Sequence, residues 1–344
     1  MPAESVIFGL KHTQIAMKTI SLLIYEDAIL SSISGVMDML LGVNRYMAEM
    51  GREPAFKLEL ISEKVKNIQL HLPAQFICYR TIEEVKHTDL ILVPAFEGTA
   101  DMVLQKNRVL TDWLGIMYGR GAEIASLCFG SYFLAEAGLL SGKSCTSHWM
   151  AQDDMRSRYP DITVLPDKVM TDQEGIYTSG GAFISLNLVL YLIEKFCGRE
   201  VSIWISKMFS IDMDRVNQSH FAVFQGQRRH EDEEILRAQA FIEQHYDQQI
   251  SIEQIAEQAN MSKRNFIRRF KIATKNTPLE YLQRVKIESA KKELEKNALN
   301  ISTLMYNAGY NDLKTFRQVF KRFTGLTPQD YRRKYCRSVA ELNN

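Results

Sequence analysis

The sequence of 344 residues has few cysteines and prolines and no long apolar run. Its five cysteines are widely spread and form no CxxC pair, which argues against a disulfide framework and a zinc knuckle. No stretch of about 18 uncharged apolar residues is present, and the first residues lack a basic head followed by an apolar segment. We therefore expect a soluble, cytoplasmic protein without a bound metal or cofactor.

The charge of the chain is unevenly distributed. The formal net charge is only +1, but residues 235–337 contain 20 Lys or Arg against 10 Asp or Glu, which gives this segment a charge of +10. The length predicts two domains, and the charge predicts that one of them binds a polyanion. A solvated basic face without a partner is the alternative, and motifs must decide between the two.

The basic third of the chain repeats itself at a separation of about 50 residues. A repeat of this length indicates two copies of one structural unit. The matched pairs, 49 positions apart in the first three and 50 in the others, are Ile255 and Leu304, Ala259 and Ala308, Met261 and Tyr310, Phe266 and Phe316, Phe270 and Phe320, Lys271 and Lys321, Thr274 and Thr324, Thr277 and Thr327, Pro278 and Pro328, and Tyr281 and Tyr331.

Each repeat has the pattern of a helix-turn-helix. In the first, a capping box at Ser251 precedes an apolar stripe at helical spacing. Asn260 tolerates the left-handed conformation of a turn, and Ser262 caps a second helix predicted from about 263 to 273. Gly309 supplies the turn in the second repeat.

The second helix of each repeat is predicted to bury phenylalanines and to expose a basic face. Two such helices on one rigid body can enter successive major grooves about 34 Å apart. Arg reads guanine, Gln reads adenine, apolar side chains contact thymine methyls, and the remaining cations bind phosphates. The candidate DNA-binding residues are Arg264, Ile267, Arg268 and Lys271 in the first helix and Leu313, Lys314, Arg317, Gln318 and Lys321 in the second.

Residues 251–333, including the closing GLTPQDYRRK, resemble the DNA-binding domain of the AraC family of bacterial transcription regulators. The resemblance implies a double helix-turn-helix that binds promoter DNA with the two basic helices. Two positions depart from the family pattern. Met305 stands where the family usually has a small Ala, and Gln318 where it often has Arg.

The first two thirds of the chain alternate apolar runs with helical patterns. The runs at 20–25, 56–62, 89–96 and 123–129 predict an α/β fold, a parallel sheet with helices on both faces. Ligands bind at the carboxyl ends of such strands. Cys128 stands at one of these ends, before a glycine turn and a helix, so the pattern resembles a nucleophile elbow in which the pKa of the thiol is lowered.

From about residue 19 to 207 the chain resembles the PfpI/ThiJ group, related to class I glutamine amidotransferases. In that group the elbow Cys pairs with a His and with an acid after the first strand. Cys128 and His148 match, whereas Ser31 and Ser32 stand where the acid is expected. The resemblance therefore implies a degenerate site reused as a sensing pocket. The candidate ligand-binding residues are Cys128, His148, Trp149, Phe96 and Phe129.

The order of the two regions resembles the GlxA group of regulators. It implies a non-enzymatic, nucleoid-associated transcription regulator that forms a homodimer and binds promoter DNA and a small metabolite, such as an amino acid or a quaternary amine. RNA polymerase is a further candidate partner. The predicted parts are a sensing and dimerisation domain at 1–213, an exposed polar linker at 214–234, a DNA-binding domain at 235–337 and a tail at 338–344.

Two alternatives stay open at this point. One is a Cys128-dependent enzyme, an amidase or a glyoxalase-like catalyst, which requires an acid near the histidine. The other is a constitutive dimeric DNA-binding protein that has no effector.

Overall fold

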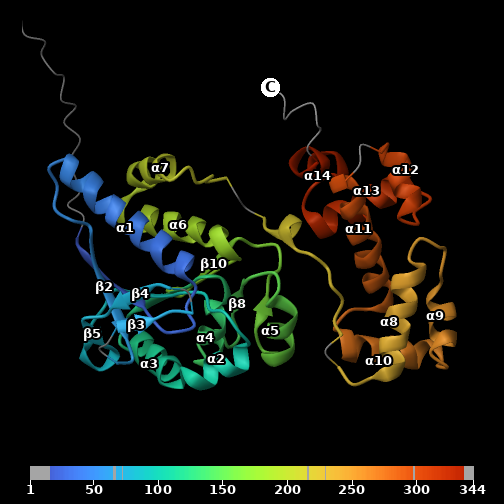
Figure 1. The fold of residues 1–344 in the computed structure, drawn as a ribbon, viewed down its shortest axis with the longest axis horizontal. Coiled ribbons are helices and arrows are strands. Elements are labelled where there is room, and N and C mark those ends of the chain that lie inside the picture. The colour runs from blue at the N-terminus through green and yellow to red at the C-terminus, as the bar shows by residue number, and fades with distance from the viewer. Residues whose placement is uncertain are drawn as a thin grey trace, which may run out of the picture. The chain divides into compact units, whose positions relative to one another are not determined.

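The structure is a computed structural model that describes residues 16–64, 67–71, 73–214, 217–228, 230–296 and 299–336 (Figure 1). Its contacts divide the chain into two compact units. The first unit comprises Met1–Leu139 and Asp172–Asp214, and the second comprises Leu140–Thr171 and Arg215–Asn344. The segment Leu140–Thr171 therefore groups by its contacts with the helical C-terminal part of the chain.

The first unit is built on a seven-stranded sheet with the strand order β10-β11-β7-β6-β1-β2-β5. The pairings from β11 through to β5 are parallel. The predicted runs become β1, β2, β6 and β7, which confirms the α/β class. The strands are β1 (Lys18–Leu23), β2 (Phe56–Ser62), β5 (Arg80–Thr81), β6 (Leu90–Val93), β7 (Glu123–Ser126), β10 (Met170–Gln173) and β11 (Ile176–Ser179), and a separate hairpin pairs β3 (Asn67–Gln69) with β4 (Gln75–Ile77).

Helices cover both faces of this sheet, which explains why some strands are buried along their whole length. All four residues of β6 are buried, as are all four of β11. Figure 1 shows α1, α6 and α7 on one face and α2, α3 and α4 on the other. These helices are α1 (Leu30–Glu49), α2 (Ala100–Lys106), α3 (Arg108–Gly119), α4 (Ser131–Glu136), α6 (Ser185–Cys197) and α7 (Arg199–Met208).

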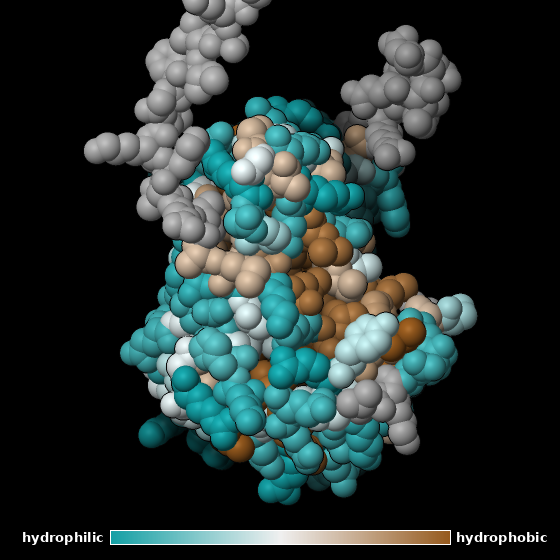
Figure 2. All heavy atoms as spheres, turned by 90° about the vertical axis from the view of Figure 1, so that its left-hand side faces the viewer, coloured by the Kyte–Doolittle hydropathy of each residue, from teal (hydrophilic) through white to brown (hydrophobic). Residues whose placement is uncertain are grey.

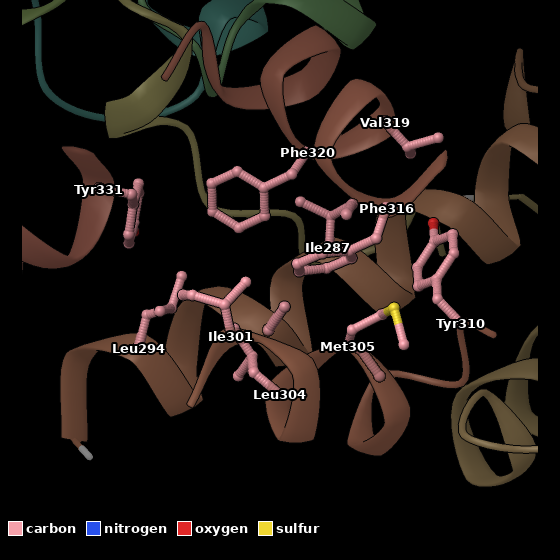
Figure 3. Close-up of a cluster of buried hydrophobic side chains, with 12 residues drawn as sticks. Ile287, Leu294, Ile301, Leu304, Met305, Tyr310, Phe316, Val319, Phe320 and Tyr331 are labelled. Carbon is pink, nitrogen blue, oxygen red and sulfur yellow. The ribbon is translucent and has the colours of Figure 1, made fainter. Parts of the chain in front are cut away.

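The second unit contains two apolar clusters that share one long helix, α11. Tyr281 and Leu282 of α11 belong to the first cluster, and Ile287 and Leu294 belong to the second. Figure 3 shows the second cluster, in which Met305 and the phenylalanines of α13 point into a common core. The elements are α5 (Gln152–Arg158), β8 (Ser144–Cys145), β9 (Thr163–Val164), α8 (Glu233–His245), α9 (Ile252–Gln258), α10 (Lys263–Thr274), α11 (Pro278–Lys296), α12 (Ile301–Asn307), α13 (Leu313–Thr324) and α14 (Pro328–Tyr335).

The predicted helix-turn-helix signals are confirmed in the structure. Ser251 forms the capping box of α9, and the Ser262 hydroxyl accepts a hydrogen bond from a backbone amide at the start of α10. The two turns occupy the left-handed region, with φ of 52° at Asn260 and 72° at Gly309. The two copies of the helix-turn-helix repeat therefore have the same local structure at the caps and turns.

The prediction of an exposed linker is wrong at Gln218 and His220. Gln218 is fully buried, and its side-chain amide donates to Thr146 Oγ1 at 2.9 Å and to the carbonyl oxygens of Ser147 at 3.1 Å and Lys168 at 2.9 Å. His220 is buried as well. A polar side chain can be buried where its hydrogen bonds are satisfied, and these partners lie about 50 to 70 residues away in the sequence, beyond the range of a local pattern.

Apolar side chains also reach the surface. On the side of the molecule seen in Figure 2, apolar surface in brown gathers among polar surface in teal. No helix within the described ranges is both long and apolar enough to cross a bilayer. In the first unit, the large apolar side chains that are more than half exposed belong to Met17, Met50, Ile77, Tyr79, Met102, Val109, Ile116 and Phe183.

The turn of the second repeat requires glycine. A Cβ added at Gly309 would lie 2.7 Å from the carbonyl oxygen of Tyr246 and 2.8 Å from that of Asp247. We expect Gly309→Ala to reduce the free energy of unfolding by at least about 1 kcal/mol, because a left-handed Ala is strained and its methyl group meets backbone atoms. Urea unfolding of the full chain measures this change. Asn260→Gly, at the equivalent turn, is the control and should leave stability unchanged or slightly raised; equal effects of the two substitutions would contradict the prediction.

Candidate functional site

Helix α10, the first of the two predicted DNA-reading helices (reading helices below), separates a buried aromatic face from an exposed cationic one. Phe266 and Phe270 are fully buried in the apolar cluster that includes Tyr281. Arg264, Arg268 and Lys271 are exposed on another face, and Ile267 is half-buried beside them. The helix therefore presents two arginines and a lysine to the solvent while its phenylalanines fix it to the domain.

The second reading helix, α13, is built in the same way. Phe316 and Phe320 are fully buried, and Val319 is 7% exposed. Leu313 is half-buried and packs against the same cluster, so only part of its surface is free for DNA. The exposed predicted residues of this helix are Lys314, Arg317, Gln318 and Lys321.

The predicted DNA-binding cations differ from their neighbours in forming no salt bridge with the residues that the structure describes. Lys263 of α10 pairs with Glu253, and Arg269 pairs with Asp232 and Glu234. In contrast, five predicted contact residues make no salt bridge and no side-chain hydrogen bond with any residue that the structure describes. These residues are Arg264, Lys271, Lys314, Arg317 and Lys321. Lys314 and Lys321 interact with the nearby carboxylates of Asp312 and Asp330, but without a direct ion pair. The exposed positive charge of the five residues suits the phosphates of a nucleic acid.

In the first unit, Cys128 lies at a sharp turn between a strand and a helix. Its φ of 55° is in the left-handed region, and its side chain is buried. Gly130 allows this turn because an added Cβ would lie 2.5 Å from the carbonyl oxygen of Val93 and 2.8 Å from that of Pro94. The backbone has the form of a nucleophile elbow.

The expected activation of this thiol is wrong. Burial raises the pKa of Cys128 to about 11, although the backbone amides of Ala182 and Phe129 donate hydrogen bonds to its sulfur and act in the opposite direction. Desolvation of the thiolate therefore outweighs the effect of the turn geometry. The group is a neutral thiol near pH 7, which makes it a poor nucleophile.

The acid that the sequence resemblance leads us to expect after the first strand is replaced by a serine. Ser32 stands there, and its hydroxyl donates to the carbonyl oxygen of Ile29 at 2.7 Å and accepts from the amide of Ala95 at 3.1 Å. The nearby Asp27 is 2.8 Å from His71 Nε2 and 3.3 Å from the Lys106 ammonium group. The Ser32 hydroxyl therefore binds backbone groups, and the Asp27 carboxylate binds the side chains of His71 and Lys106.

The five predicted ligand-binding residues fall in both units. In the first unit the ring of Phe96 packs 5.7 Å from that of Phe129, next to Cys128. In the second unit the rings of His148 and Trp149 are 5.2 Å apart. Burial lowers the pKa of His148 to about 4, so this imidazole is neutral near pH 7.

The second unit contains a cavity of about 370 Å³. Trp149 is the only predicted ligand-binding residue that lines it. A space of this size accommodates a small metabolite. The sequence did not indicate its other walls, because Asp153 and Arg156 lie in the helix just after Trp149, Phe224 falls in the predicted linker, and Arg284 and Glu288 lie far along the chain in α11. They include Asp153, Arg156, Phe224, Arg284 and Glu288.

Two family models match the chain. The model described as the DJ-1/PfpI family matches residues 41–195, and the one described as a helix-turn-helix domain matches residues 255–334. The first match includes the segment Leu140–Thr171, whose contacts place it in the second unit.

Two relatives from Pseudomonas aeruginosa are named HTH-type transcriptional regulators. GbdR (strain UCBPP-PA14) is 26% identical over 217 residues, which are 62% of this chain and 58% of GbdR. The match thus spans less than two thirds of that relative's length. CdhR is 26% identical over 252 residues, which are 72% of this chain and 74% of CdhR.

Among solved structures, a ThiJ/PfpI family protein from Pseudomonas syringae is 17% identical. The match covers 62% of this chain and 83% of that protein, and its TM-score of 0.51 supports the fold.

The raised pKa of Cys128 predicts low reactivity. At pH 7.5 iodoacetamide should alkylate Cys128 at least about tenfold more slowly than Cys336, which is partly exposed, because only the thiolate reacts. Mass spectrometry of the digested full chain over a labelling time course gives both rates. Labelling in urea, where all five thiols are accessible, is the control. Labelling of Cys128 as fast as that of Cys336 would show an activated thiol.

Proposed function

This chain joins a domain of the DJ-1/PfpI family to an AraC-type helix-turn-helix domain, and we propose that it is a transcription regulator that binds promoter DNA sequence-specifically through α10 and α13. The observation that carries the proposal is the pair of similarly built helices, α10 and α13, each with exposed cations that form no salt bridge with the residues that the structure describes. The names of GbdR and CdhR as transcriptional regulators support it.

The exposed residues suggest a division of roles within each helix. Arg264, Arg268 and Arg317 carry the planar guanidinium group that binds guanine through two hydrogen bonds, and Gln318 carries the amide suited to adenine. The exposed lysines of both helices supply phosphate contacts, which contribute affinity without base preference.

The same proposal includes a small-molecule effector and a homodimer. The cavity beside Trp149 supports effector binding, because its size suits a metabolite and its walls combine aromatic with charged side chains. Exposed apolar side chains of the first unit, including Ile77 and Tyr79, support self-association. RNA polymerase stays a predicted partner.

The enzyme alternative lacks support at the elbow. A Cys nucleophile needs a thiolate and a base, whereas Cys128 has a raised pKa and the expected acid is replaced by Ser32. Fold likeness to a group that contains enzymes does not supply these groups. The elbow is thus better explained as part of the packing of the first unit.

DNA binding can be tested residue by residue. The probe is a duplex that the wild-type chain enriches from a random-sequence library. Arg317→Ala should weaken binding by about 1 to 3 kcal/mol and relax the preference at one base pair, because a base contact is lost. Lys321→Ala should weaken all sequences alike and reduce the slope of log affinity against log salt by about 1, because one phosphate contact is lost.

Fluorescence anisotropy at several salt concentrations measures both effects. Lys292→Ala, an exposed lysine of α11 outside the reading helices, is the matched control and should change neither affinity nor slope. If Arg317→Ala and Lys321→Ala leave binding at the wild-type level, α13 does not contact the duplex.

The effector and the dimer can be tested together by thermal unfolding of the full chain with amino acids and betaines. A ligand present at 100 times its Kd should stabilise the protein by about 2.7 kcal/mol, and a dimer should unfold at a temperature that rises with protein concentration. Trp149→Ala should abolish the ligand shift, whereas Cys128→Ser should preserve it. Loss of the shift only in Cys128→Ser would place the pocket at the elbow, and no shift with any compound would favour the constitutive alternative.

A further inference from the structure

Arg269 of α10 belongs to the reading helix but does not share its exposed face. Its guanidinium group binds Asp232 through two hydrogen bonds, from Nε at 3.0 Å and from a terminal nitrogen at 2.7 Å. The same terminal nitrogen is 3.0 Å from a carboxylate oxygen of Glu234. Such a two-pronged pair fixes the direction of the guanidinium plane as well as its distance.

The acidic side of this contact lies where the linker meets the DNA-binding helices. Asp232 is the N-cap of α8, and its carboxylate accepts a hydrogen bond from the Ile235 amide at 3.2 Å. Glu234 lies in the first turn of the same helix. One carboxylate thus caps α8 and binds α10 at the same time. We call the contact of Arg269 with Asp232 and Glu234 the α8–α10 clamp.

The clamp is tethered to the linker. His230, two residues before Asp232, bonds to Gln239 of α8 at 2.9 Å, and the Gln239 amide donates to the carbonyl oxygen of Gln227 at 3.0 Å. Two residues near the end of the linker, Gln227 and His230, therefore bind α8. A displacement of this end changes the position of the carboxylates that hold Arg269.

The second repeat has no such clamp. The repeat offset of 50 residues places Val319 at the position of Arg269, and Val319 is buried in the second apolar cluster. The long helix among the elements that α13 packs against is the continuous α11, which runs from Pro278 to Lys296 and so has no N-cap at that point. Helix α10 is thus held partly by a carboxylate pair, whereas α13 is held by apolar packing together with a hydrogen bond from Arg322 to Gln283 of α11 and the contact of Arg284 with the Phe323 ring.

We propose that Arg269 is a positioning residue for DNA reading. The α8–α10 clamp keeps its guanidinium group away from the phosphates and sets the orientation of α10. This inference rests on the proposed function. It assigns to the linker end a control over the half of the DNA site that α10 reads, and it leaves the half read by α13 independent of that control. Arg269 acts through Arg264 and Arg268, which face the bases.

A direct phosphate contact by Arg269 is the competing explanation, and the acidic partner separates the two. If Arg269 bound phosphate, Asp232→Asn would remove a nearby negative charge, release the arginine and tighten DNA binding. If the clamp positions α10, Asp232→Asn weakens binding. Asn is as good an N-cap as Asp, so this substitution removes the charge but keeps the cap of α8.

The experiment measures the affinity and base preference of the full chain on the duplex that the wild type enriches from a random library. We expect Asp232→Asn and Arg269→Gln each to lower affinity by about tenfold, and the double variant to be no weaker than the weaker single variant, because both remove one interaction. The loss of base preference should be confined to the half-site whose preference Arg264→Ala also alters.

The α13 half-site is the internal control, since Arg317→Ala identifies it and its preference should persist in every clamp variant. Tighter or unchanged binding by Asp232→Asn overturns the inference in favour of direct contact. An equal loss of preference in both half-sites, with a lower melting temperature, overturns it in favour of a merely structural role. If the wild type enriches no sequence at all, the proposed function fails before the clamp is tested.

Discussion

The double helix-turn-helix depends on one helix, α11, that belongs to two apolar clusters. Tyr281 packs with the phenylalanines of α10, and Ile287 and Leu294 pack with those of α13. Each fully buried phenylalanine contributes about 1.5 to 3 kcal/mol, so separating either reading helix from α11 would cost several times that amount. The two helices therefore behave as parts of one body, which fixed groove-to-groove spacing on DNA requires.

The middle of the linker is attached to the same helix through a buried ion pair. Lys291 and Glu288 of α11 are 2.8 Å apart; the ammonium group donates to the carbonyl oxygen of Ala222, and the carboxylate accepts from the amide of Phe224. Removing one partner would leave an unpaired charge in a buried place, which is strongly unfavourable. The Phe224 ring also packs against that of Tyr281 at 5.1 Å. This part of the linker thus belongs structurally to the DNA-binding body.

The sequence predicted those features that follow from local periodicity. Phe266 and Phe270 were expected inside because they recur at i, i+4, and the capping box at Ser251 has a fixed spacing. The burial of Gln218 was not predictable, since its partners lie 50 to 72 residues away. The raised pKa of Cys128 follows from burial, which the elbow motif does not encode. Nothing in the sequence distinguishes Arg269 from the other basic residues of α10, because its carboxylate partner Asp232 lies 37 residues away.

In the proposed regulator, a ligand changes DNA binding only if it binds one arrangement of the protein more tightly than another, with 1.4 kcal/mol of difference for each tenfold change in affinity. The walls of the 370 Å³ cavity give such a difference a physical route. They include Gln227, whose side-chain amide donates to Asp153 and whose side-chain oxygen accepts from Asn276, just after α10. A ligand that moves Gln227 would disturb two attachments of α10. One is the hydrogen bond from Asn276 in the turn after the helix, and the other is the bond from Gln239 of α8, the helix that Asp232 caps. The same cavity is lined by Ile287 of the second apolar cluster and by Phe323 of α13, so a ligand there contacts the packing of α13 as well as the linker.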